Sequence, residues 1–220
     1  MPTALIEVRD LVVRFGERLV LDRLTFDVGA GEFLCILGPS GSGKTTLLRV
    51  FGGLVPPTSG TVRIAAEPVE RAWGRAAYVF QSPRLVPWRT ALGNIELAQE
   101  LRVGRADRDR ARRYLAMVGL SELAQRFPAV LSGGERQRVA LARALAVEPE
   151  VIYMDEPFSA LDGATRTRLR EELREIWHAE RRTIVFVTHD VAESDALATR
   201  VLELTERPAR IAAIRAPSPV

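Results

Sequence analysis

The chain has 220 residues, 47% of them hydrophobic, with 31 basic and 28 acidic side chains and a formal net charge of +3. This length and apolar content suit one packed domain and exclude a disordered chain. No segment reaches the roughly 18–20 apolar residues of a membrane span, and the first residues do not read as a secretory leader. The single cysteine, Cys35, allows no internal disulfide and favours a reducing cytosol.

In chain order, the expected strands are 5–15, 24–28, 33–37, 61–64, 77–80, 151–154 and 183–188, followed by a terminal hairpin of 201–204 with 210–214. The expected helices are 44–53 and 163–180, and the stretch over about 92–147 has a helical pattern with no convincing strand. Strands that alternate with helices predict parallel βαβ units. We therefore expect one α/β domain over 1–220, with a core at about 1–84 and 150–220 and a helical subdomain at about 85–149.

The most informative segment lies between the strand at 33–37 and the helix at 44–53. It fits the phosphate-binding pattern G-x-x-x-x-G-K-[ST], with Gly38, Pro39, Ser40, Gly41, Ser42, Gly43, Lys44, Thr45 and Thr46 as the candidate nucleotide-binding residues. Glycines let the backbone close around a phosphate, and the start of the helix supplies free N–H donors. Lys44 is the only lysine of the chain, and Thr45 can offer its hydroxyl to Mg²⁺.

Two acidic residues end the apolar run at 151–154. Asp155, at the carboxyl edge of a strand, can hold Mg²⁺ directly or through water. Glu156 is placed where a base could take a proton from an attacking water molecule. The alternative is an ordinary turn or helix start, which is a weaker explanation beside a phosphate-binding loop.

A third motif, Leu131-Ser132-Gly133-Gly134-Glu135, opens a helix. Ser132 with Glu135 also fits a capping box that any helix could use. Two glycines in a first helical turn are costly, however, and a second phosphate-binding backbone explains them better.

In these motifs the chain closely resembles the nucleotide-binding subunits of ABC transporters, over essentially its whole length. The resemblance implies a P-loop NTPase core, mostly a parallel sheet with flanking helices, preceded by an antiparallel β part and interrupted by a helical insertion. It also implies that Ser132, Gly133 and Gly134 form the family signature. Asp155 and Glu156 match the Walker B acid and the catalytic glutamate.

The remaining family motifs are present in the family's order. Phe80-Gln81-Ser82 resembles the Q-loop, where Gln81 would assist catalysis and contact Mg²⁺. Ser159-Ala160-Leu161-Asp162 resembles the D-loop, with Asp162 near the nucleotide, and Thr188-His189-Asp190 resembles the switch region, with His189 catalytic. Phe15 lies where the family stacks adenine.

Taken singly, each of these residues has a plainer interpretation. Phe15 would be a core aromatic residue, Gln81 an ordinary polar residue after a strand, and His189 a histidine at a strand end. Asp190 and Glu193 could cap the next helix, which is compatible with a role for His189.

The resemblance implies ATP hydrolysis with Mg²⁺ at a site shared by two copies of the chain. The P-loop of one copy would bind ATP, and the signature of a second, head-to-tail copy would cover the γ-phosphate. It further implies transmembrane permease subunits, an extracytoplasmic solute-binding protein, and a peripheral position on the cytoplasmic face of the inner membrane. No nucleic-acid partner is expected, because the arginines are interleaved with acids and do not form a basic face.

The segment Arg84-Leu85-Val86-Pro87-Trp88 resembles the nitrate, sulfonate and taurine group of importer ATPases. Trp88 is then expected to anchor a permease helix in a groove formed by 81–92, although it could also pack at the subdomain boundary. The alternatives for the whole chain are the ATPase of an exporter, a soluble ABC-type ATPase that acts on nucleic acid, and a P-loop kinase.

Overall fold

The computed structural model describes residues 4–218, which form two compact units. The first unit combines the chain up to Ala76 with the chain from Arg181 onward, and the second unit is Ala77–Glu180. The second unit is larger than the predicted helical subdomain at about 85–149, because it also contains 77–84 and 150–180. The division into an α/β core and a helical subdomain at the predicted bounds stays a prediction.

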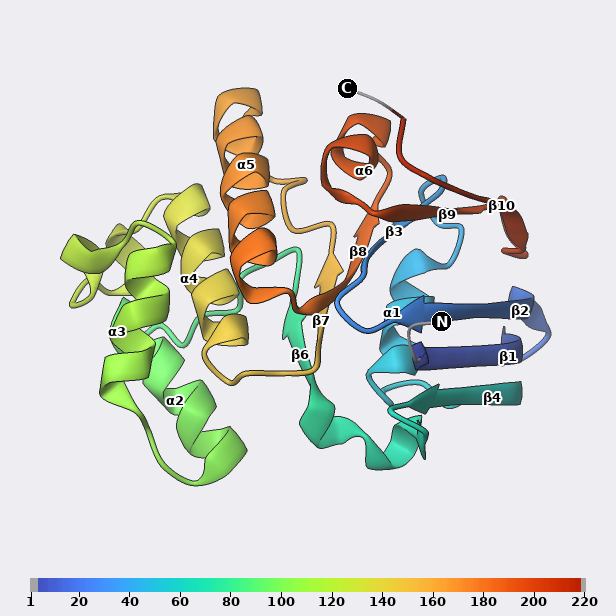
Figure 1. The fold of residues 1–220 in the computed structure, drawn as a ribbon, viewed down its shortest axis with the longest axis horizontal. Helices are drawn as coiled ribbons and strands as arrows, with labels where there is room; N and C mark the ends of the chain where they lie inside the picture. Colours follow the sequence, from blue (N-terminus) through green and yellow to red (C-terminus); the bar gives the residue numbers. More distant parts are fainter. Residues whose placement is uncertain (1–3, 219–220) are drawn as a thin grey trace. The chain divides into compact units, whose positions relative to one another are not determined.

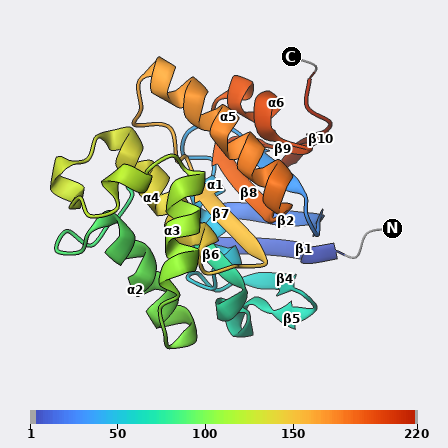
Figure 2. The same ribbon diagram turned by 60° about the vertical axis from the view of Figure 1, so that its left-hand side comes forward.

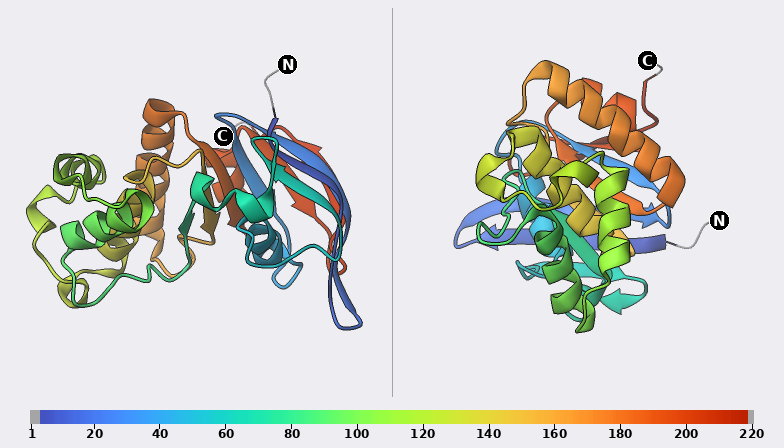
Figure 3. Two further views of the ribbon diagram at one scale, coloured as in Figure 1. Left: turned by 90° about the horizontal axis from the view of Figure 1, so that it is seen from below. Right: turned by 90° about the vertical axis from the view of Figure 1, so that its left-hand side faces the viewer.

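The first unit contains an antiparallel sheet of strand order β2-β1-β4-β5. Its strands are β1 (Ala4–Phe15), β2 (Arg18–Gly29), β4 (Ser59–Ile64) and β5 (Glu67–Pro68). Figure 1 shows β1, β2 and β4 side by side, and Figure 3 shows β1 and β2 as a long hairpin.

The strand β2 begins at Arg18, whereas the sequence predicted a start at residue 24. The early part of β2 pairs with the end of β1, from Phe15 opposite Arg18 to Val13 opposite Leu21. The register shifts between these pairs, and Arg23 has a positive φ of 53°. Such bulges break the period of two by which a strand is recognised in a sequence.

A second group of strands in the first unit has the order β10-β9-β3-β8. It consists of β3 (Phe33–Leu37), β8 (Thr183–Thr188), β9 (Arg200–Leu204) and β10 (Ile211–Arg215), with the helices α1 (Lys44–Phe51) and α6 (Val191–Leu197). β3 pairs in parallel with both β8 and β9, and β10 closes the predicted antiparallel hairpin with β9. Every residue of β3 is buried, as expected for a strand of a parallel sheet with both faces covered.

The second unit contains two strands that are hydrogen-bonded neighbours, β6 (Ala76–Val79) and β7 (Val151–Asp155). Its helices are α2 (Ala91–Val103), α3 (Arg108–Met117), α4 (Gly133–Leu145) and α5 (Gly163–Glu180). α2, α3 and α4 pack against one another, as can be followed in Figure 2. The predicted apolar stripe of α5, Leu169, Leu173, Ile176 and Trp177, is buried.

Together these elements confirm the predicted fold class: an antiparallel N-terminal sheet, parallel strands with flanking helices, and a helical insertion. Cys35 is buried in β3, and burial raises the pKa of its thiol. Within residues 4–218, no helix is both long enough and apolar enough to cross a bilayer.

Candidate functional site

The P-loop follows β3 in the first unit, at the carboxyl edge of three parallel strands. Leu37 at the end of β3 pairs with Thr188 at the end of β8 and with Glu203 near the end of β9. In a parallel sheet, paired strand ends emerge on one side. The loop after Leu37, His189 after β8 and the turn after β9 therefore lie at the same edge.

The P-loop is held open by glycines in conformations that side chains rarely adopt. Gly41 has φ +76° and Gly43 has φ +121°, and Gly43 is the N-cap of α1. A Cβ on Gly43 would lie 2.9 Å from a methyl carbon of Leu21, and a Cβ on Gly38 would lie 3.0 Å from the carbonyl oxygen of Leu204. The tight fit at two points of the loop explains why the motif requires glycine there.

Lys44 lies inside this loop, with only 4% of its surface exposed. Its Nζ donates hydrogen bonds to the carbonyl oxygens of Gly38 and Pro39, at 2.7 and 2.8 Å. The hydroxyl of Ser42 is buried and has no hydrogen-bond partner among the described residues. A buried cation beside an unsatisfied donor, at the start of a helix, fits an anionic phosphate group. Thr45 and Thr46 follow in the first turn of α1, both half-buried.

Phe15 ends β1 with 53% of its surface exposed, so it is not the core aromatic residue of the plainer interpretation. His189 is exposed directly after the buried strand β8. The side chain of Thr188 donates to Glu193 at 2.5 Å, and Asp190 accepts from the backbone N–H groups of Ala192 and Glu193. The predicted cap of the following helix is thus present, and it fixes the backbone on both sides of His189.

The second unit contains the two acids and Gln81. Glu156, directly after β7, has a positive φ of 44°, which is uncommon for a residue with a side chain. The Ser159 hydroxyl donates to the carbonyl oxygen of Glu156 at 2.9 Å, and Gln81 Nε2 donates to the same hydroxyl at 3.0 Å. Gln81 is thereby tied to the turn that follows Asp155 and Glu156. Strained backbone held by its surroundings is often found at functional sites.

The start of α4 has the complete capping box that the plainer interpretation of the signature predicted. Ser132 Oγ accepts from the N–H of Glu135, and the Glu135 carboxylate accepts from the N–H of Ser132 at 2.7 Å. The hydrogen bond from the Ser132 N–H holds the pKa of Glu135 below its usual value. The capping box does not by itself account for Gly133 and Gly134.

Gly134 has a packing reason to be glycine, because an added Cβ would lie 2.8 Å from Cγ2 of Thr165 in α5. Asp162 accepts a hydrogen bond from the N–H of the same Thr165 at 3.0 Å, which lowers the pKa of Asp162. Gly133 is exposed and has open space, with Leu161 as its nearest neighbour at 3.8 Å. Gly133 is therefore the glycine of the motif that packing does not explain.

A hollow of about 400 Å³ collects several of these segments within the second unit. It is lined by Gln81, Ser82, Pro83, Gly133, Arg136, Gln137, Pro157, Ala160 and Leu161. The Q-loop, the start of the signature helix and the D-loop thus face one cavity. The structure brings Gln81 and the signature together there, and it brings the P-loop and the strand end before His189 together in the first unit.

Sequence reasoning did not identify the residues that hold these loops. Arg143 in α4 donates to the carbonyl oxygens of Pro83 and Arg84, both at 2.9 Å. Asn94 in α2 is 1% exposed, and its side chain bonds to the backbone of Val86, Arg89 and Thr90. A polar residue inside a helix gives no sign of such partners in a sequence. The burial of Asn94, which is seen only in the structure, is the feature that points to them.

Within residues 4–218, no group of three His, Cys, Asp or Glu side chains could hold a metal ion. The predicted Mg²⁺ ligands are of another kind: the hydroxyl of Thr45, the amide of Gln81 and the single carboxylate of Asp155. Oxygen donors of this type suit Mg²⁺, which keeps water and phosphate oxygens as further ligands.

Comparison with known proteins identifies a consistent set of relatives. A family model described as "ABC transporter" matches residues 21–159. A protein named aliphatic sulfonates import ATP-binding protein SsuB 1, from Mesorhizobium japonicum, is 46% identical over 193 residues, which are 87% of this chain and 72% of the relative. A protein of the same name from Pseudomonas syringae pv. tomato is 47% identical over 201 residues, covering 91% of this chain and 70% of the relative.

Among solved structures, the ATP-binding cassette MJ0796, as a dimer in a post-hydrolysis state bound to ADP and Pi, has a TM-score of 0.83 and 31% identity. The match covers 98% of this chain and all of the other. This likeness extends over both the antiparallel β part and the helical insertion.

Replacing Lys44 by Ala should weaken nucleotide binding at least about tenfold, because a charge-assisted hydrogen bond contributes about 1.5–3 kcal/mol. Titration calorimetry with ADP measures the effect. Arg49→Ala, which removes an exposed cation from the same helix, is the matched control and should bind ADP like the parent. An affinity of the Lys44 variant within about twofold of the parent, roughly 0.4 kcal/mol, would contradict the interpretation of the loop.

Proposed function

The chain belongs to the ABC transporter family, and on that premise we propose that it is the ATP-hydrolysing subunit of a membrane importer for aliphatic sulfonates or chemically related small anions. The observation that carries the nucleotide part is the buried Lys44 inside the P-loop, bonded to two carbonyl oxygens of the loop. When ATP enters, phosphate oxygens can replace these carbonyls as partners of the ammonium group.

In this proposal the residues of the P-loop, Gly38 to Thr46, bind the phosphates of ATP, and the exposed ring of Phe15 supplies an apolar platform for adenine. Thr45, Gln81 and Asp155 would hold Mg²⁺, which when bound neutralises charge on the phosphate oxygens. Backbone N–H groups and a cation placed in advance need no rearrangement when charge develops on the phosphate.

Glu156 is proposed as the base that accepts a proton from the attacking water molecule. Its position is supported by the strained backbone and by the Ser159 hydroxyl, which holds its carbonyl oxygen. Gln81 bonds to the same serine, so a change at the Q-loop can reach the turn that carries Glu156. His189 is proposed to contact the γ-phosphate from the edge of β8.

We propose that the active form is a head-to-tail dimer of this chain with ATP between the copies. The signature segment supports this proposal, because Ser132 and Gly133 are exposed and Gly133 has open space beside it. The helix start also presents N–H donors to an anion. The related cassette of known structure is dimeric.

The permease contact is proposed at the segment 83–90, which is rigidly held. Arg143 fixes the carbonyl groups at its start, and Asn94 fixes the backbone from Val86 to Thr90. Trp88 nevertheless has 75% of its surface exposed, so it does not pack within its unit. A large exposed aromatic side chain on a pinned backbone is suited to anchor a partner helix without a large loss of entropy.

The rest of the proposed assembly follows from this role: permease subunits, an extracytoplasmic solute-binding protein, and a peripheral position on the cytoplasmic face of the inner membrane. The names of the two relatives support sulfonates as the solute class. The basic stretch at 102–113 does not favour nucleic acid, since four of its six arginines pair with acids: Arg108 with Glu96, Arg110 with Asp107 and Glu148, Arg112 with Asp109, and Arg113 with Glu148.

Replacing Glu156 by Gln should slow ATP hydrolysis about 10²-fold or more, the usual contribution of a general base. The amide keeps the shape of the side chain but cannot accept the proton. ATP should therefore trap a dimer, which size-exclusion chromatography with light scattering would detect.

Two controls make this test specific. ADP should not produce the dimer, and neither should ATP with the double variant Lys44→Ala/Glu156→Gln, because its P-loop lacks the cation. A Glu156→Gln protein that binds ATP and stays monomeric would count against the shared site.

Replacing Trp88 by Ala should leave the basal ATPase rate of the isolated subunit within about twofold of the parent. It should abolish energy-dependent uptake of an alkanesulfonate by cells that produce the whole transporter, because an interface anchor contributes about 2 kcal/mol or more. Ile214→Ala on β10 removes another exposed apolar side chain and serves as the control, with normal uptake. Normal uptake with Trp88→Ala would refute the anchor. Uptake of nitrate but of no sulfonate by the parent would refute the proposed solute class.

A further inference from the structure

A residue outside all the motifs touches the P-loop. Arg207 lies in the turn between β9 and β10, and its Nη2 donates a hydrogen bond to the carbonyl oxygen of Gly41 at 2.6 Å. The Nε–H of the same guanidinium is buried and has no hydrogen-bond partner among the described residues. A buried donor without a partner costs free energy. The hydrogen bonds that the Arg207 side chain itself gains therefore do not explain why it lies here.

The contact falls on a peptide that follows a glycine. Gly41 has φ +76°, and without a side chain its backbone has more freedom to rotate than that of other residues, so the direction of its carbonyl group depends on what holds it. In the structure this peptide is held from both sides. Its carbonyl oxygen accepts from Arg207, and its N–H donates to the carbonyl oxygen of Pro39 at 3.2 Å.

The turn that carries Arg207 is itself anchored next to the loop. Leu204, at the end of β9, lies against Gly38. Ala209 exchanges backbone hydrogen bonds with β2, donating to Val20 at 2.9 Å and accepting from Asp22 at 3.0 Å. Val20 and Leu21 are the residues that pack against Gly43. The segment 204–209 therefore contacts the P-loop directly at Gly38 and Gly41, and through β2 at Gly43.

We propose that Arg207 is a positioning residue for phosphate binding: it keeps the carbonyl oxygen of Gly41 turned outward so that the loop presents donors to the nucleotide. This inference rests on the proposed binding of ATP at the P-loop and assigns a new role to the C-terminal hairpin. Without Arg207, the Gly41 carbonyl is free to rotate inward, where its partial negative charge repels a phosphate.

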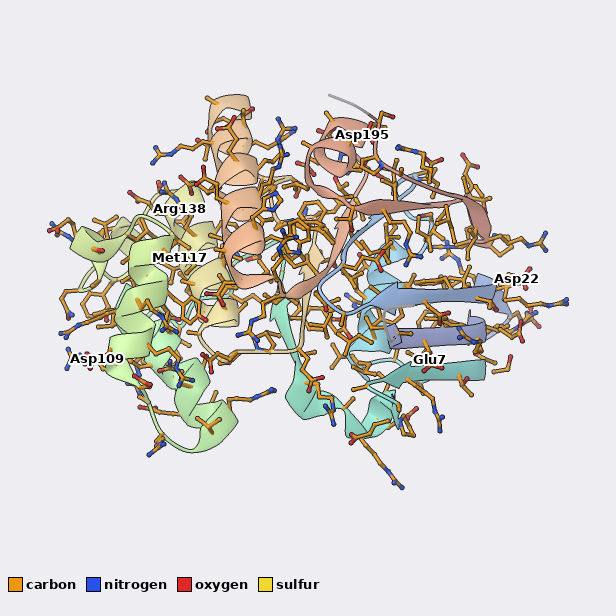
Figure 4. The ribbon with its side chains drawn as sticks, viewed as in Figure 1. Glu7, Asp22, Asp109, Met117, Arg138 and Asp195 are labelled. Atoms are coloured by element: carbon orange, nitrogen blue, oxygen red, sulfur yellow. The ribbon has the colours of Figure 1, made fainter. Side chains whose placement is uncertain are left out.

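The test replaces Arg207 by Met, which keeps an unbranched apolar side chain and removes every donor. Arg210→Met is the matched control from the same hairpin. Arg210 binds Asp22, labelled on β2 in Figure 4, through Nε at 2.8 Å and Nη2 at 2.7 Å. Among the described residues, no hydrogen bond or ion pair of its side chain reaches the loop 38–46. ADP affinity is measured by titration calorimetry on the full chain at a temperature where circular dichroism shows all variants folded.

We expect Arg207→Met to weaken ADP binding about tenfold and to raise the half-saturating ATP concentration by a similar factor, with the rate at saturating ATP within about threefold of the parent. Arg207→Lys should recover part of the affinity through its single ammonium donor. Arg210→Met should bind ADP within about twofold of the parent. A general loss of folding would lower the maximal rate and leave the half-saturating concentration unchanged.

ADP affinity of Arg207→Met within twofold of the parent would overturn the inference. An equal loss in Arg210→Met would also overturn it, because the effect would then belong to the whole hairpin. Failure of the proposed function looks different: the unmodified chain would bind no ADP, or Lys44→Ala would bind it as well as the parent.

Discussion

The site depends on one physical requirement: the backbone from Gly38 to Lys44 must stay open so that an anionic phosphate group can enter. Gly38, Gly41 and Gly43 have no side chains to pack, so much of the shape of the loop is imposed by its surroundings. The buried strand β3 fixes its start, and helix α1 fixes its end. Leu204 and Leu21 leave room only for hydrogen at Gly38 and Gly43, and Lys44 fills the interior with its ammonium group. The parallel pairing of β3 with β8 and β9 brings the required neighbours to the same edge.

In the second unit, the loops must keep an uncommon backbone conformation, and hydrogen bonds between the loops hold it in place. Glu156 has a positive φ, Ser159 holds its carbonyl oxygen, and Gln81 holds Ser159. The capping box pairs the N–H groups of Ser132 and Glu135 at the helix start. Thr165 links the signature to the D-loop, because a Cβ on Gly134 would meet it and its N–H donates to Asp162. Each of these segments is thus held by a hydrogen bond or a close packing contact to another one. Changes at one segment can therefore be transmitted to the next.

Much of this could be read from the sequence, because the informative features are local. The P-loop, the buried strands and the cap of α6 each depend on residues a few positions apart. The prediction failed where geometry breaks the period, as at the bulged start of β2 near Arg23. It was also silent where a side chain reaches far along the chain: Arg143 binds the backbone 59 and 60 residues away, and Arg207 binds Gly41 across 166 residues. The ion pair of Arg215 with Asp195, which is labelled in Figure 4, is of the same kind. Long-range hydrogen bonds of arginine leave no pattern in one sequence.

In the proposed dimer, one ATP lies between the P-loop of one copy and the signature of the other. The most direct measurement is a thiol cross-link between two different chains, one with Ser40→Cys and the other with Ser132→Cys, both exposed positions. The native Cys35 is buried and its thiol pKa is raised, so it should not react. With a short bifunctional maleimide, a covalent dimer should form from the mixed chains in the presence of a non-hydrolysable ATP analogue, and neither chain alone should yield it. A mixture that gives no more dimer with the analogue than without it, or no more than the Ser40→Cys chain alone, would contradict the shared site.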